Sequence, residues 1–166
     1  KSLVEEWPTI LRELEKRRVF KIEVCRCDLS ILKRIVGYIN IEVGAEATKG
    51  RKVFLDKPVE YDFTTKGLVF RAPNPQDILK EAGVKAGLTA VSGFHASEHV
   101  TIEGTNTITG GASSDMGGIS LGSSGLIFIY DGSLGGNGAT KMLYDRLEDA
   151  FKRGHRIVNE CGCDSE

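Results

Sequence analysis

The arrangement of apolar and polar residues is clearest in the last quarter of the chain. Residues 126–130 form an unbroken apolar and aromatic run, which is typical of a strand buried on both faces. Asp131 ends this run, and a loop with four glycines leads to residues 142–151, where apolar side chains recur at helical spacing. Gly154 is a suitable end for that helix. The pattern predicts a buried strand, a tight glycine corner and an amphipathic helix.

The first half of the chain predicts one helix followed by strands. Residues 3–18 are expected to be a helix, because their apolar side chains follow helical spacing: Leu3, Trp7, Ile10, Leu11 and Leu14. Residues 19–25 alternate apolar and charged side chains, as a half-buried strand does. Short extended segments at 53–55, 59–63 and 68–70 then predict an antiparallel meander. Beyond it, helices are expected at 75–86 and 88–103, and a short strand at 119–121.

Composition places the chain among ordinary globular proteins. Its 166 residues suit one domain, or one domain with a small appendage, and 40% of them are hydrophobic. The net charge of −1 excludes an overall basic field for nucleic acid, although a local basic face at residues 16–18 or 49–52 remains open. With no run of 18 apolar residues and no signal peptide, we expect a cytoplasmic protein without a membrane segment. Because the chain starts at Lys1 and stops soon after a cysteine pair, we expect it to be a piece of a longer protein.

The four cysteines form two Cys-x-Cys pairs, Cys25/Cys27 and Cys161/Cys163. With no sign of export, this usage favours reduced thiols or metal ligands over structural disulfides. Cys161 and Cys163 follow a helix and supply half of a four-cysteine zinc site. Cys25 and Cys27 either complete those four ligands or, as we favour, lie on one face of a strand as ordinary buried thiols.

Several segments follow one another in an order that resembles a known family, the C-terminal zinc-binding (MZB-type) domain of MrfA-like DEAD/DEAH-box DNA repair helicases. The matching segments are Tyr130-Asp131-Gly132, Gly135-Gly136-Asn137-Gly138, the helix at 142–151 and Cys161-Gly162-Cys163. Weaker matches at residues 34–38, 63–68 and 115–118 extend the similarity to about residues 34–163. Family members continue with a Gly-Cys-Pro-x-Cys segment. The resemblance therefore implies structural zinc with Cys161 and Cys163 as two ligands, in a site that is incomplete within this chain.

The residues and the resemblance together predict an α+β fold. We expect a mixed or largely antiparallel sheet with packed helices and a C-terminal cysteine zinc knuckle. Residues 1–33 would be a helix and strand of uncertain affiliation, and residues 34–166 the MZB-like domain. The resemblance implies an accessory, non-catalytic domain of an ATP-dependent superfamily 2 DNA helicase. Such a domain guides or contacts single-stranded DNA beside RecA-like motor domains, which alone bind ATP.

The glycine loop at residues 132–141 raises the question of a phosphate site, because a glycine loop that opens a helix offers N–H groups to anions. Its letters match neither the Walker loop nor the dinucleotide motif, so we exclude an ATP site. We favour a structural corner in which the glycines adopt positive φ angles and allow close backbone approach. The second interpretation is a nucleic-acid phosphate contact through Gly136, Gly138 and Lys141. Asp131 is expected to accept N–H bonds from this turn.

The segment His95-Ala96-Ser97-Glu98-His99 fits the H-x-x-E-H motif of inverted zinc proteases. On a helix both imidazoles would share one face and bind zinc while Glu98 polarises a water, so a zinc metallohydrolase is one alternative function. We favour a structural polar network in which His95, Glu98 and His99 bond to surrounding loops and to Asp131. A third hypothesis, from the same family, is a protein-interaction module of a DNA-defence complex.

Overall fold

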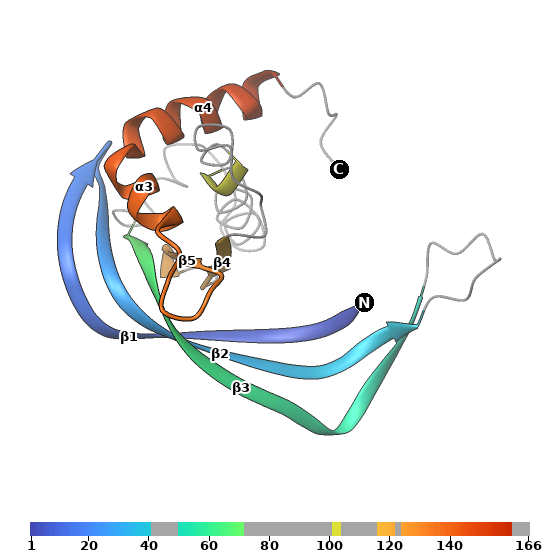
Figure 1. Cartoon of the computed structure of the whole chain (residues 1–166). Helices are drawn as coiled ribbons and strands as arrows, with labels where there is room; N and C mark the ends of the chain where they lie inside the picture. The colour runs from blue at the N-terminus through green and yellow to red at the C-terminus, as the bar shows by residue number, and fades with distance from the viewer. Residues whose placement is uncertain (41–49, 72–100, 104–115, 122–123, 161–166) are drawn as a thin grey trace.

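The computed structural model describes residues 1–40, 50–71, 101–103, 116–121 and 124–160 (Figure 1). Within these residues the chain forms a five-stranded sheet with helices on one face. The elements in chain order are β1 (Ser2–Val19), β2 (Ile22–Asn40), β3 (Arg51–Arg71), β4 (Met116–Ser120), β5 (Leu126–Asp131), α3 (Ala139–Asp145) and α4 (Leu147–Glu160). The strand order is β1-β2-β3-β5-β4, and every neighbouring pair is antiparallel.

Three long strands dominate the molecule and run side by side (Figure 1). β1 and β2 form a hairpin that pairs Ser2 with Tyr38 at one end and Val19 with Ile22 at the other. β3 bends sharply where residues 55–58 lie opposite the single residue Val36 of β2. This local excess of residues on one strand is a bulge, and bulges bend a strand and increase its twist.

The predicted helix at residues 3–18 is wrong, because this segment is β1. Three register shifts interrupt its pairing with β2, between Leu3 and Val4, Ile10 and Arg12, and Glu13 and Glu15. The last two shifts leave Leu11 and Leu14 as the extra residues of bulges. Trp7 pairs with Leu32 and Ile10 pairs with Leu29. The side chains of Trp7 and Ile10 therefore lie on opposite faces of the sheet. The apolar stripe with helical spacing is therefore divided between two faces and two bulges.

The predicted α+β class is also wrong. An antiparallel sheet makes up most of the described chain, rather than a fold of helices packed on a sheet with a zinc knuckle. The strand expected at 126–130 is present as β5. The helix expected at 142–151 is divided between α3 and α4, and α4 continues past Gly154, the expected end, to Glu160. Residues 161–166, where the knuckle was expected, lie outside the described residues.

Two apolar clusters hold the sheet in place, one on each face. On the face that carries α3 and α4, buried strand residues pack against helix residues: Val24, Leu68, Phe70 and Ile129 against Leu143, Tyr144, Leu147 and Ala150. The opposite face carries Cys25, Cys27, Leu29, Ile31, Val69, Ile119, Phe128 and Tyr130. The sheet curves around this second cluster, so that β1 approaches β4 and the Tyr130 hydroxyl donates to Glu6 of β1 at 2.9 Å. Each large apolar side chain buried in this way contributes about 1.5–3 kcal/mol to stability.

Candidate functional site

Asp131 ends β5 with a fully buried side chain and holds the glycine loop that follows it. Its Oδ1 accepts the N–H of Thr140 at 2.8 Å, and Oδ2 accepts those of Asn137 and Gly138 at 3.1 and 3.2 Å. Thr140 lies in the first turn of α3, where N–H groups lack partners within the helix and a negative charge is favourable. The carboxylate thus acts as an acceptor for the turn, in agreement with the interpretation of the sequence.

The glycines of this loop have the backbone conformations expected of them. Gly135, Gly136 and Gly138 have φ angles of 77°, 90° and 86°. A Cβ atom on Gly136 would lie 2.8 Å from Cγ of Lys66 and 2.9 Å from Oδ2 of Asp131. The position therefore requires glycine both for its backbone conformation and for the close approach of its neighbours.

The N–H groups of residues 135–140 in the loop are already donated within the chain. Those of Gly135 and Gly136 bond to the carbonyl oxygens of Thr64 and Ser133, at 2.8 and 2.9 Å. Asn137, Gly138 and Thr140 donate to Asp131, and Ala139 donates to the side chain of Asn137. A phosphate at this loop would consequently depend on the Lys141 side chain more than on the backbone.

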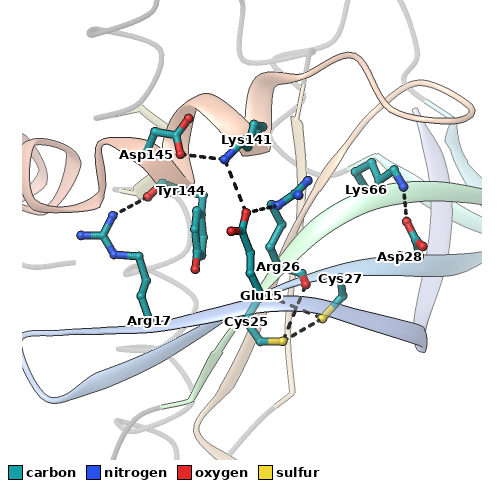
Figure 2. A network of polar contacts seen from close by, with 10 residues as sticks. All are labelled: Glu15, Arg17, Cys25, Arg26, Cys27, Asp28, Lys66, Lys141, Tyr144 and Asp145. Carbon is teal, nitrogen blue, oxygen red and sulfur yellow. Dashed lines mark hydrogen bonds and ion pairs between the residues drawn. The ribbon is translucent and has the colours of Figure 1, made fainter.

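Lys141 lies on the exposed side of α3 between two acidic side chains (Figure 2). Its Nζ is 2.9 Å from Oδ1 of Asp145 and 3.4 Å from Oε1 of Glu15. The hydrogen bond to Asp145 is the main cause that raises the pKa of Lys141. Glu15 also accepts from Arg26 at 2.6 Å, and this bond is the main cause that lowers the pKa of Glu15. The charge of Lys141 is therefore largely balanced by acidic groups of the same chain, and its contact with nucleic acid remains a prediction.

The other polar contacts of this region join α3 to β1 and join the first three strands to one another (Figure 2). Arg17 of β1 donates to the carbonyl oxygen of Tyr144 at 2.9 Å, and its guanidinium lies 5.7 Å from the centre of that ring. Asp28 of β2 pairs with both Lys66 and Arg12, and the bond from Lys66 is the main cause that lowers the pKa of Asp28.

Cys25 and Cys27 are buried on the opposite face of the sheet, with their sulfur atoms 3.3 Å apart. Burial, followed by the hydrogen bond to Cys25, raises the pKa of Cys27 to about 12. Zinc binds the thiolate form of cysteine, which this environment disfavours. Within the part of the chain that the structure describes, no three His, Cys, Asp or Glu side chains gather as a metal site. The geometry agrees with the interpretation of these cysteines as buried thiols on one strand face.

Residues 97–166 match the family model of the MrfA Zn-binding domain. The resemblance recognised in the sequence is thereby confirmed, although the match begins at residue 97 and the resemblance was expected from about residue 34. The matched segment, residues 97–166, includes β4, β5, the glycine loop, α3 and α4. No curated protein matches the chain.

Two crystal structures of the DUF1998 helicase MrfA share the fold over almost the whole chain. The DNA-bound one has a TM-score of 0.69 at 14% identity, over 98% of this chain and 21% of that one. The other has a TM-score of 0.65 at 13% identity, over 99% of this chain and 21% of that one. The chain thus spans about a fifth of the length of these helicases.

Among the described helices, none has the length and apolar character needed to cross a membrane.

Five of the residues singled out from the sequence lie outside the described residues: His95, Glu98, His99, Cys161 and Cys163. The H-x-x-E-H network, its hydrolase alternative and the zinc ligands therefore stay predictions. Both Cys161 and Cys163 fall within the segment that matches the MrfA Zn-binding domain.

A surface hollow that the sequence did not suggest lies at the tip of the β1–β2 hairpin. Among the described residues it is lined by Phe20 of the turn and by Phe151, Lys152 and Arg156 of α4. The alternation of residues 19–25 carried a strand signal, but the helix expected just before it concealed the two-residue turn at Phe20 and Lys21. Two alternating strands joined by two residues would have been the signal for a hairpin.

Proposed function

We propose that this chain is an accessory domain of an ATP-dependent superfamily 2 DNA helicase and contacts DNA beside RecA-like motor domains. The observation that carries the proposal is the MrfA fold over 98% of the chain, together with the MrfA Zn-binding family match at residues 97–166. One of the solved helicases with this fold is bound to DNA. We assign ATP binding to the motor domains in the same or a partner chain, DNA repair to the parent helicase, and the cytoplasm as its location.

The chemistry of the described residues supports a binding domain more than a reaction centre. The Asp131 carboxylate is occupied by three backbone N–H groups, so a role in proton transfer would break the turn that it holds. Lys141, which lies in the first turn of α3, is balanced by Glu15 and Asp145. These groups form a rigid platform on which α3 and the loop are fixed relative to the sheet.

The test is DNA binding by the 166-residue chain, measured by fluorescence anisotropy with a labelled oligonucleotide at two salt concentrations. We expect binding that weakens as salt rises, because contacts to phosphates release counterions. Lys141→Gln should weaken binding modestly, and Lys57→Gln, an exposed lysine at the bend of β3, is the matched control. Absence of any salt-dependent DNA binding would refute the proposed function.

We further propose that zinc is bound through the Cys161 and Cys163 thiolates and has a structural role. Two thiols separated by one residue are suitable donors for tetrahedral zinc, and both lie in the MrfA Zn-binding match. Because two thiolates are half of a four-ligand site, the test uses the parent helicase. Its elemental analysis should show less zinc in Cys161→Ser and Cys163→Ser, while the matched variant Cys25→Ser keeps its content. Loss of zinc in Cys25→Ser would show that the buried pair, Cys25 and Cys27, also supplies zinc ligands. Loss in His95→Ala, with the cysteines intact, would favour the hydrolase alternative.

A further inference from the structure

The hollow at the hairpin tip combines two aromatic rings with two cations. Its volume is about 440 Å³, within the range of small-ligand sites. The rings of Phe20 and Phe151 are tilted by 55° with centroids 6.2 Å apart, and Phe151 in turn packs edge-on against Phe70 at 6.1 Å. Phe151 is therefore fixed to the core, while Phe20 is 61% exposed. One ring anchors the hollow and the other presents its surface to solvent.

The turn that carries Phe20 has an unusual backbone. Phe20 and Lys21 have φ angles of 48° and 64°, and no glycine or asparagine occupies either position. Two-residue hairpin turns of this kind favour Asn-Gly, because a residue with a Cβ atom is strained in the left-handed region. Backbone strain of this kind often marks functional sites. The β1–β2 hairpin ends beside α4 (Figure 1), and there the ring of Phe20 in the turn contacts Phe151 of α4.

The charge of the hollow differs from that of the glycine loop. Lys152 and Arg156 are one helical turn apart on α4, and both are exposed. Neither forms an ion pair with an acidic side chain among the described residues. Lys141, by contrast, is paired twice. The hollow therefore retains positive charge beside an exposed aromatic ring.

We propose that this hollow binds single-stranded DNA, with a base stacked on the exposed ring of Phe20, which Phe151 supports, and the neighbouring phosphates bound by Lys152 and Arg156. An aromatic platform flanked by cations is the usual arrangement for single strands, whose bases have free faces. Bases in a duplex are already stacked on one another, so a duplex would meet the two cations alone. The inference rests on the proposed function and adds to it the residues that hold the single strand that the family resemblance implies.

The test compares labelled oligothymidine with a duplex of the same length, by fluorescence anisotropy of the 166-residue chain over a series of salt concentrations. Phe20→Ala should weaken single-strand binding about 5- to 150-fold, the usual loss for one stacked base, with an unchanged salt slope. Phe20→Trp keeps an aromatic ring and should therefore retain single-strand binding. The matched control is Phe54→Ala, which removes a phenylalanine that is 67% exposed on β3, away from the hollow. It should bind as the unaltered chain does.

The double variant Lys152→Gln/Arg156→Gln should also weaken binding and lower the salt slope, by about 0.7 for each phosphate that is no longer neutralised. The far-ultraviolet circular dichroism and urea midpoint of each variant show whether it is folded. If the unaltered chain binds single strands and Phe20→Ala binds them equally well, or loses duplex affinity to the same extent, the inference is wrong while the proposed function stands. If the unaltered chain binds no DNA, both fail.

Discussion

The most direct perturbation of the structure is the removal of the buried carboxylate that holds the glycine loop. Asp131→Ala leaves three N–H groups without their acceptor. Thr140 is 1% exposed, so its N–H cannot be hydrated in the folded chain. Asn137 and Gly138 are exposed, and water can replace the carboxylate there. The three bonds therefore do not contribute equally to stability.

The cost follows from this difference. A buried N–H left unsatisfied costs about 1–3 kcal/mol, and each bond that water replaces costs about 0.5–1.5 kcal/mol. We therefore expect Asp131→Ala to lower the free energy of unfolding by about 2–6 kcal/mol. Asp131→Asn keeps one carbonyl oxygen but loses the charge and one acceptor, so its loss should be intermediate. Asp145→Ala removes an exposed ion pair of the same region and should change stability by less than about 0.5 kcal/mol.

Urea unfolding followed by circular dichroism measures these differences, provided that the slope with denaturant stays the same among the variants. The urea midpoint should be highest for the unaltered chain and Asp145→Ala, lower for Asp131→Asn and lowest for Asp131→Ala. A loss below about 1 kcal/mol for Asp131→Ala, with an unchanged slope, would show that the loop does not depend on this carboxylate.

Three further predictions concern single positions. Gly135→Ala introduces backbone strain alone and should lower the free energy of unfolding by about 1–2 kcal/mol. Gly136→Ala adds contacts below 3 Å to that strain and should cost about 1–3 kcal/mol more. Equal urea midpoints for the two variants would contradict the geometry of the loop. Lys21→Gly relieves a positive φ angle and should raise stability by about 1 kcal/mol, and a lower midpoint would refute the strain assigned to the turn. The pKa of Cys27 is about 12 in the folded chain against 9.0 for an ordinary thiol, so the folded state keeps a proton that the unfolded state loses. This retained proton contributes fully to the stability of the folded state below pH 9, and the contribution is lost as pH rises toward 12. In Cys27→Ala the urea midpoint should therefore fall less over that pH range than in the unaltered chain. An equal fall in both would refute this linkage.

The elements near the glycine loop were predictable because local sequence determines them. An unbroken apolar run specified β5, glycines marked positions with positive φ, and an acid before the turn indicated an acceptor. β1 was not predictable in this way. Its apolar residues are divided between the two faces of the sheet and the bulges at Leu11 and Leu14, so their helical spacing marks no single buried face.

The hollow at the hairpin tip was missed for a different reason. It joins Phe20 of the β1–β2 turn to Phe151 of α4, and no local pattern connects residues so far apart in the chain. The ion pair between Lys141 and Glu15 depends on the same long-range packing, because Lys141 comes from α3 and Glu15 from β1. Such contacts become visible only when the register of the sheet is known.

The order of strands in the sheet has a consequence for how the chain folds. β1, β2 and β3 pair in sequence, so this meander forms from contacts between segments that are close along the chain. β5 then joins β3 by pairing Gly67 with Tyr130, which requires closing a long stretch of chain. Because non-local strand pairing is slow, we infer that the meander forms first and that joining of β5 limits the folding rate. Until then the edge of β3 is open to pairing with other chains, a common origin of aggregation.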